Sequence, residues 1–297
     1  MMRPLVLVLI AFLTVACSAG DEGVDALARN AAHGDRGAAK RLVLAMGDRT
    51  RERSLDAYKS VVSVGNVVIP YLYKGLASDD QDLFEACAAA LGNIGSTDSL
   101  PALKTALGRK GMRRYAVAWA LGEIGDPSVT VLLVRSLATG DVVLRKAAVR
   151  ALVRLGPSVG PQVLEMLERS DDPKARRAAI RVLGEIKEQA AVPLLTEVEG
   201  INRDAAVWAL GRIGNPQALQ PLLKDLSDER WSVRRQAAQA LGNLEDAGAV
   251  PALRRTLDDP EAVVREWAAR SLETLTGKRV LYRDEDGQIV PPYNLYH

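Results

Sequence analysis

Apolar residues recur at steps of three and four along most of the chain. Around residue 120, Val117, Ala118, Leu121 and Ile124 share one face of a helix, and a second apolar stripe follows after a short break. This alternation predicts pairs of antiparallel helices joined by tight turns. Because neither helix of a pair can bury its stripe alone, we expect successive pairs to stack against one another.

One leucine marks each unit of the pattern, in segments such as AWALGEIG and VWALGRIG. It recurs at positions 91, 121, 152, 183, 210, 241 and 272, at intervals of 30 or 31 residues except for one of 27 that ends at Leu210. Val61 extends the series toward the N-terminus, and residues 24–47 have room for one further degenerate helix pair. Such a period is typical of a solenoid. The short interval predicts a local change in its curvature.

Glycines stand where the first helix of a unit should end. Gly125 and Gly214 occupy a place that often adopts the left-handed conformation open to glycine, and Asp126 and Asn215 can then cap the second helix. A G-x-x-G loop can also cradle phosphate. That role needs a converging site, usually at the start of a helix, whereas these glycines close one. The recurrence therefore favours a structural role.

The alternation of A-x-A-L-G-x-I-G with A-V-P-x-L resembles the HEAT repeat, in the form called the PBS-lyase-type HEAT-like repeat, over about residues 50–275. The resemblance implies an all-α fold, a right-handed α-solenoid of about seven to eight helical hairpins. It also implies that aspartates and arginines form structural ladders between neighbouring repeats. The residues concerned are Asp141 with Arg145, Asp172 with Arg176, Asp228 with Arg234, and Asp259 with Arg265.

The N-terminal segment MMRPLVLVLIAFLTVAC combines one positive charge with an apolar stretch too short to span a bilayer, which indicates a signal peptide over residues 1–16. Residues 14–17 resemble a bacterial lipobox, in which Cys17 is acylated and becomes the mature N-terminus. Ser18 resembles an outer-membrane sorting signal. We therefore expect a chain anchored through Cys17 to the membrane of the bacterial cell envelope, facing the periplasm, with residues 17–49 as linker. Ordinary signal cleavage and a mistaken start codon are the alternatives.

Composition offers little chemistry. The 39 basic and 37 acidic residues are interspersed, so a net charge of +2 creates no long-range field for a polyanion. The two histidines, His33 and His297, are far apart in the sequence and predict neither a metal site nor a catalytic triad. Cys87 lies among alanines, which predicts a buried and inert thiol. We expect no cofactor, no metal and no enzyme activity.

Two other functions are weighed. The repeat class includes bilin lyases, so a lyase or lyase-accessory protein acting on a protein-bound chromophore is the alternative function, although predicted export argues against it. HEAT-like glycosylases give a precedent for nucleic-acid binding through arginines. Here Glu185 and Glu188 offset the arginine charge, so we expect no nucleic acid, and no small-molecule substrate either. The arginines are Arg150, Arg154, Arg177 and Arg181.

A protein-binding surface remains, for a partner of unknown identity. If the second helices line the concave face, the residues after each P-x-L motif point toward the partner. Their mixed charge suits a protein better than a polyanion, and an ordinary solvated ridge is the alternative. The row consists of Lys104, Arg135, Glu165, Glu197, Lys224, Asp225, Arg254 and Arg255. Three tryptophans beside the repeat leucines predict packing, and Trp231 is left undecided between packing and binding.

The C-terminal segment, residues 276–297, departs from the repeat. Residues 280–282 and 288–290 face each other across an Asp286-Gly287 turn, which predicts a short hairpin. Because the ends of a solenoid need covering, we expect it to cap the last repeat. A tail that docks on another protein is the alternative.

Overall fold

The computed structural model describes residues 23–292. The predicted signal peptide and Cys17 lie outside the described residues. The chain divides into two compact units, Met1–Ile124 and Gly125–His297. Among the described residues, no helix is long and apolar enough to cross a membrane.

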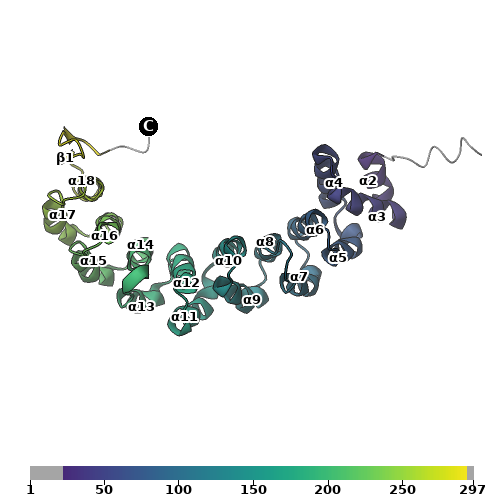
Figure 1. The fold of residues 1–297 in the computed structure, drawn as a ribbon, viewed down its shortest axis with the longest axis horizontal. Coiled ribbons are helices and arrows are strands. Elements are labelled where there is room, and N and C mark those ends of the chain that lie inside the picture. The colour runs from purple at the N-terminus through teal and green to yellow at the C-terminus, as the bar shows by residue number, and fades with distance from the viewer. Residues whose placement is uncertain (1–22, 293–297) are drawn as a thin grey trace, which may run out of the picture. The chain divides into compact units, whose positions relative to one another are not determined.

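The first unit consists of helical pairs followed by one further helix (Figure 1). Residues 24–47, where the sequence left room for one further helix pair, form two helices of nine residues each. The helices are α2 Val24–Ala32, α3 Arg36–Leu44, α4 Arg51–Val64, α5 Ile69–Leu76, α6 Gln81–Ile94, α7 Leu100–Leu107 and α8 Tyr115–Ile124.

The second unit continues the same alternation and ends in a hairpin of two short strands. Its helices are α9 Thr130–Arg135, α10 Val142–Leu155, α11 Gly160–Arg169, α12 Pro173–Glu185, α13 Val192–Thr196, α14 Arg203–Ile213, α15 Leu219–Asp225, α16 Trp231–Leu244, α17 Val250–Thr256 and α18 Ala262–Thr276. The strands are β1 Tyr282–Arg283 and β2 Ile289–Val290. With the first unit, this confirms the predicted all-α solenoid of stacked helical pairs.

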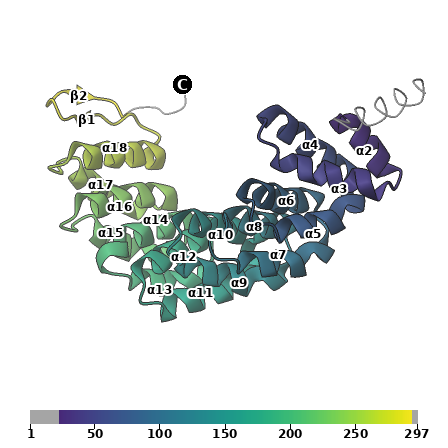
Figure 2. The same ribbon diagram turned by 45° about the vertical axis from the view of Figure 1, so that its right-hand side comes forward.

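The helices of the second unit form two layers. The even-numbered helices from α10 to α18 pack side by side in one layer. The odd-numbered helices from α9 to α17 form a second layer that packs against the first. Within this unit, Figure 1 shows the even-numbered helices on the inner side of the curve, and Figure 2 shows the same two layers from another angle. We call the exposed surface of the even-numbered helices the inner face and that of the odd-numbered helices the outer face.

Small residues in the A-L-G segments bring the inner helices into close contact. A Cβ atom on Gly211 of α14 would lie 2.6 Å from the Cα of Ala240 on α16, and one on Gly184 of α12 would lie 3.0 Å from the Cα of Ala209. A larger side chain at Gly211 would therefore push two backbones apart. Because the layer with the closer helix spacing must lie on the inside of a bend, these residues set the direction of curvature.

The predicted turn chemistry is confirmed. Gly125 and Gly214 both have positive φ angles, 76° and 72°. The Asp126 and Asn215 side chains each accept a backbone N–H two residues later, at 2.8 and 2.9 Å. Each cap starts a short 3-10 turn, Pro127–Val129 or Pro216–Ala218, that leads into the second helix.

The 27-residue interval is accommodated by a short outer helix, α13, and by a later start of α14, which begins seven residues before its leucine, whereas α12 and α16 begin ten residues before theirs. Helix α13 has five residues, whereas α11, the preceding outer helix, has ten. Asn202 bridges the shortened repeat, because its side-chain amide donates to the Pro173 carbonyl on α12 at 3.0 Å. The expected change in curvature at this repeat stays a prediction.

The hairpin lies against the last helix. Tyr282 pairs with Val290 and Arg283 with Ile289 in an antiparallel register, which confirms the predicted hairpin but places its first strand at Tyr282–Arg283 instead of residues 280–282. Arg265 of α18 holds the hairpin, since its Nε donates to the Arg283 carbonyl at 2.6 Å and an Nη to the Asp284 carbonyl at 2.9 Å. These contacts are those expected of a cap.

Candidate protein-binding surface

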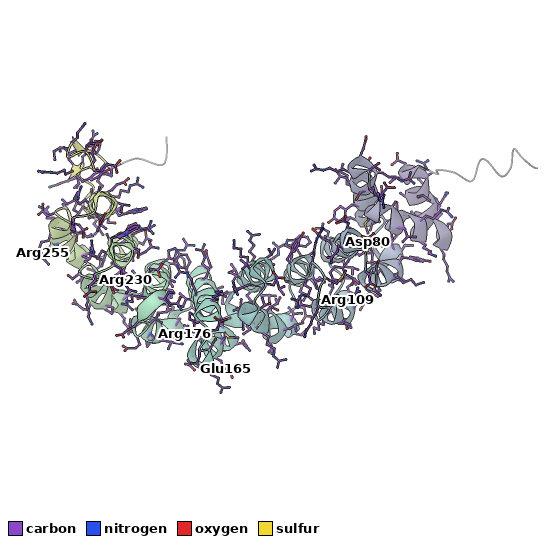
Figure 3. All side chains as sticks on the ribbon, in the orientation of Figure 1. Asp80, Arg109, Glu165, Arg176, Arg230 and Arg255 are labelled. Atoms are coloured by element: carbon purple, nitrogen blue, oxygen red, sulfur yellow. The ribbon has the colours of Figure 1, made fainter. Side chains whose placement is uncertain are left out.

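The row predicted from the sequence does not line the concave face of the second unit. In the second unit, the members of this row lie on α9, α11, α15 and α17, and Glu197 caps the C-terminus of α13. All of these helices belong to the outer layer. Figure 3 shows Glu165 and Arg255 on this outer side. Arg135, Glu165, Glu197, Lys224, Arg254 and Arg255 are exposed, while Lys104 is half-buried on α7 in the first unit. The assignment of the second helices to the concave face was wrong, because the small A-L-G residues draw the other layer inward.

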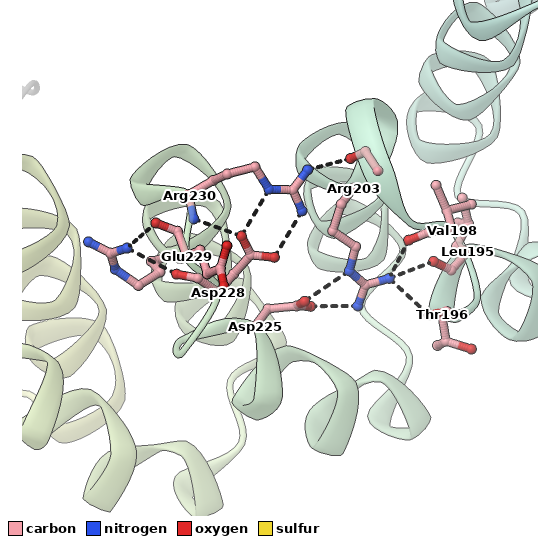
Figure 4. A network of polar contacts seen from close by, with 10 residues as sticks. Leu195, Thr196, Val198, Arg203, Asp225, Asp228, Glu229 and Arg230 are labelled. Carbon is pink, nitrogen blue, oxygen red and sulfur yellow. Dashed lines mark hydrogen bonds and ion pairs between the residues drawn. The ribbon is translucent and has the colours of Figure 1, made fainter.

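Asp225 has a structural role and does not belong to an exposed row. It is 6% exposed, and its two carboxylate oxygens accept hydrogen bonds from Arg203 at 2.8 and 2.7 Å. Figure 4 shows the Arg203 guanidinium between this carboxylate and the backbone carbonyls of residues 195, 196 and 198. Both charges are therefore matched inside the unit, and Asp225 is unavailable to a partner.

Arg203 belongs to a column of five arginines, each seven residues before a repeat leucine. Every member donates from one Nη to a backbone carbonyl in the last turn of the preceding outer helix or in the turn that follows it, which satisfies that backbone acceptor. Arg234 also binds Asp259 of the next repeat through two hydrogen bonds, at 2.7 and 3.0 Å. The column consists of Arg145, Arg176, Arg203, Arg234 and Arg265.

The expected ladder is thus found in part. Arg234 with Asp259 joins neighbouring repeats as the resemblance implies, whereas Asp141 and Asp172 instead cap the starts of α10 and α12. Arg203 was missed, although its intervals of 27 residues from Arg176 and 31 from Arg234 copy those of the leucines. That period is the signal that could have found it.

Three rows of side chains cover the inner face of the second unit. They stand six and two residues before and two residues after each repeat leucine, on the side of the helix opposite the core. The first row is Lys146, Arg177, Asp204, Arg235 and Glu266. The second is Arg150, Arg181, Trp208, Gln239 and Arg270, and the third is Arg154, Glu185, Arg212, Asn243 and Thr274.

Ion pairs connect residues of these rows on the adjacent helices α12 and α14. Arg177 of α12 binds Asp204 of α14 through two hydrogen bonds, at 2.9 and 2.7 Å. Burial alone would raise the pKa of Asp204, but the Arg177 hydrogen bond and charge outweigh it and lower the pKa below its ordinary value. Glu185 binds Arg181 at 2.6 Å and Arg212 at 3.1 Å.

Trp208 packs as the sequence predicts. Its ring lies against Gly184 of the neighbouring helix, and the Arg181 guanidinium lies 4.2 Å from the ring centre. Trp231, which the sequence left undecided, is 47% exposed at the first residue of α16. The tryptophan beside a repeat leucine is thus part of the stack, and Trp231 is accessible at the edge.

A groove of about 1010 Å³ lies between α18 and the hairpin. Val263, Tyr282 and Val290 give it apolar walls, and carboxylates surround it. Two of these carboxylates are engaged, since Glu266 binds Arg270 at 2.5 Å and Glu273 accepts the Val280 N–H at 3.0 Å. The lining of this groove is mainly acidic, with Arg279 as its basic member, in contrast to the inner rows on α10 and α12.

Two kinds of side chain, metal ligands and a nucleophilic thiol, can be compared with the sequence. Between residues 23 and 292, no group of three or more His, Cys, Asp or Glu side chains is arranged to hold a metal ion. Cys87 is fully buried, and burial raises the pKa of its thiol to about 12. A thiol with that pKa is not a nucleophile near neutral pH.

The fold and the periodic arginines define a helical-repeat protein, and family comparison names the repeat. A model of HEAT repeats matches residues 69–153 and 199–273, more than half of the chain, and a model of the PBS lyase HEAT-like repeat matches residues 175–198. The chain belongs to the HEAT-repeat family. No curated protein matches it.

Solved structures agree on the fold. An importin beta structure is 17% identical with a TM-score of 0.54, covering 89% of this chain and 42% of that one. A Kap95p structure with RanGDP is 16% identical with a TM-score of 0.58, covering 80% and 40%. The CpcE–CpcF complex of phycocyanin lyase from Nostoc is 23% identical with a TM-score of 0.39, covering 69% and 86%. The first two matches show a likeness of the fold alone, and the third, with its lower TM-score, adds no argument.

Proposed function

We propose that this chain is an exported, membrane-anchored HEAT-repeat scaffold that binds another protein through its inner face and performs no catalysis. The observation that carries the proposal is the inner face of the second unit. There, five parallel helices present exposed and half-buried side chains in register, on a backbone fixed by close packing at residues such as Gly211. HEAT repeats generally mediate protein–protein interaction, and stacked repeats suit extended partners.

The charge distribution supports a protein partner. Basic side chains on α10 and α12 are followed in the same row by Asp204 on α14, Arg235 on α16 and Glu266 on α18. A surface whose charge alternates over a few helices selects a partner with the complementary order of charges. A uniform polyanion would meet repulsion at Asp204 and Glu266.

Membrane attachment is proposed through acylation of Cys17. The support is the short apolar stretch before it and the lipobox-like residues 14–17. Mass analysis of the mature N-terminus tests this part alone. An acylated Cys17 is the expected result, and an unmodified chain starting at Met1 would overturn both export and anchoring.

Site-specific photo-crosslinking in cells tests the scaffold function. A benzophenone amino acid at Gln239 of α16 reports on the inner face, and the same residue at Glu197 reports on the outer face. We expect a discrete protein adduct from position 239 and none from position 197. Adducts from position 197 alone would move the surface to the outer helices, and the absence of adducts from both would argue against a stable partner.

The match of residues 175–198 to the PBS lyase HEAT-like repeat favours a second candidate, a lyase or lyase-accessory protein acting on a protein-bound chromophore. This candidate predicts that the purified chain retains a tetrapyrrole. Visible absorbance of the protein isolated from cells that make such pigments distinguishes the two. A chromophore band that co-elutes with the protein would favour the lyase, and its absence would favour the scaffold.

A further inference from the structure

The strongest local concentration of charge in the second unit lies on two adjacent inner helices. Lys146, Arg150 and Arg154 stand four residues apart on one side of α10, which places successive side chains about 6 Å apart along the helix. Arg177 and Arg181 occupy the first two of the same rows on α12. All five side chains are exposed. We call these five residues the basic patch.

Two of these five charges, those of Lys146 and Arg150, are not neutralised by the described residues. On α12, Arg177 binds Asp204 and Arg181 binds Glu185. On α10, Lys146 and Arg150 make no ion pair or hydrogen bond with the side chains that the structure describes. Glu188, which the sequence suggested as an offset, lies in the turn after α12, where its carboxylate accepts the Ala190 N–H at 3.1 Å. The surplus positive charge therefore sits on α10.

Exposed apolar side chains adjoin the basic patch. Val142, one turn before Lys146 in the same line, is 51% exposed, and Val143 is 56% exposed. Side chains four residues apart on a helix lie one above the other. Along this side of α10, one apolar residue, Val142, is therefore followed by three basic residues. A ligand that follows α10 would meet a hydrophobic contact first and cations afterwards.

The dimensions of the basic patch fit a short segment of protein. It spans two helices, whose axes in such packing lie about 8–10 Å apart, and three positions along α10. A nucleic acid that binds through its backbone gains its affinity from many phosphate contacts along a continuous path. Here the path stops at the third helix, where the same two rows present Asp204 and Trp208.

We propose that the basic patch binds an acidic segment of the partner protein, with carboxylates at one-turn spacing and an apolar residue beside Val142. The inference rests on the proposed scaffold function and names the chemistry of its partner. Arginine forms paired hydrogen bonds with a carboxylate, and Arg150 has its guanidinium available for one. Lys146 and Arg150 provide the recognition, while the pairing of Arg177 and Arg181 keeps the surface ordered.

Peptide binding to the full chain tests the inference. The probe is a fluorescein-labelled helical peptide with a leucine followed by glutamates on three successive turns, and the reference peptide carries glutamines instead. The test variant is Lys146→Glu with Arg150→Glu. The matched control, Arg135→Glu with Arg254→Glu, makes the same change in net charge at exposed positions on the outer helices α9 and α17.

We expect the acidic peptide to bind the wild-type chain and the control equally, within about twofold, and the test variant at least tenfold more weakly, a loss of about 1.4 kcal/mol. The glutamine peptide should not bind. An equal loss in both variants, or no binding of the acidic peptide to the wild-type chain, would overturn the proposal. Stronger binding of single-stranded DNA or of phosphatidylglycerol vesicles at the same patch would also overturn it, because the patch would then serve a different class of ligand.

Crosslinking at position 239 separates this inference from the proposed function. If the wild-type chain and the test variant capture the same protein equally, the result supports the scaffold function and contradicts the proposed role of the basic patch. If the wild-type chain captures nothing from position 239 or from position 197, the scaffold function itself is contradicted. Capture that is lost in the test variant and kept in the control supports both.

Discussion

Arginines five residues apart on α10 have opposite roles. Arg145 belongs to the arginine column, and its guanidinium turns back to the Thr139 carbonyl before the helix begins. Arg150 belongs to the basic patch and extends from the inner face. The same contrast holds between Arg203, whose side chain is 10% exposed, and Arg177, at 51%. The position relative to the repeat leucine, rather than the residue type, decides whether an arginine holds the fold or is available to a partner.

This contrast explains how a regular scaffold can carry a specific surface. The column binds mainly backbone carbonyls, which every repeat supplies whatever its side chains are. Exposed members of the inner rows such as Lys146 and Arg150 lie outside the core, so residues at these positions can change without disturbing the stack, whereas Trp208 packs against Gly184. Stability and recognition thus depend on different positions of the same repeat, and substitutions should separate them.

Replacing Arg203 with methionine should have the largest effect on stability. The change leaves the Asp225 carboxylate buried without its partner, which typically costs about 3–5 kcal/mol. Urea unfolding followed by circular dichroism would measure the loss. The double variant Arg203→Met with Asp225→Leu should recover the part that comes from the unpaired carboxylate, because an apolar pair often replaces a buried ion pair at little cost, while the carbonyls of residues 195, 196 and 198 still lack their donor. A loss below about 1 kcal/mol in the single variant would show that the column does not stabilise the fold.

The sequence predicted the stack better than the surface. The leucine period and the glycine caps were sufficient for the helical pairs, because they depend on local chemistry that repeats. The concave face was assigned to the wrong helices, since the assignment followed the P-x-L motif and not the packing of residues such as Gly184 against Ala209. Asp225 was misplaced for a related reason. Its burial depends on Arg203, a partner 22 residues earlier, and the polarity of a residue does not reveal such a contact.

Replacing Arg265 with glutamine should release the hairpin while leaving the helices in place. Arg265 is the last member of the column and has no following repeat to contact. It donates hydrogen bonds to the carbonyls of residues 283 and 284 in the hairpin, whereas Arg234 binds Asp259 of the next repeat. Loss of such bonds costs about 1–3 kcal/mol locally. Hydrogen exchange should show faster exchange at the Asp284 amide, which donates to the Gln288 carbonyl, and little change in α14.

Two companion variants decide what the hairpin does. Arg279→Gln changes an exposed arginine beside the same groove and should leave exchange unchanged. Deleting residues 278–297 separates a cap from a docking tail. Loss of helicity in the deleted chain supports the cap, whereas intact helicity with lost partner capture would mean that the segment docks on another protein.

Replacing Arg181 with glutamine should have a small effect. Arg181 is 55% exposed, and its contacts are an exposed ion pair with Glu185 and the ring of Trp208. Contacts of these kinds contribute about 0.5–1 kcal/mol each at exposed sites. A double-mutant cycle with Trp208→Leu would isolate the contribution of the ring. A coupling above about 2 kcal/mol would place Arg181 with the structural arginines and would contradict its assignment to the surface.

Replacing Arg150 with alanine should change stability least, within about 0.5 kcal/mol, because the side chain is exposed and makes no ion pair among the described residues. Arg145→Ala, on the same helix, should cost more, since it leaves the Thr139 carbonyl without its donor. Unfolding midpoints of the two variants measure the difference directly. If both lose the same stability, burial does not distinguish the two kinds of arginine. If Arg150→Ala keeps its stability but weakens acidic-peptide binding, the exposed arginine serves recognition, as the geometry of the inner face requires.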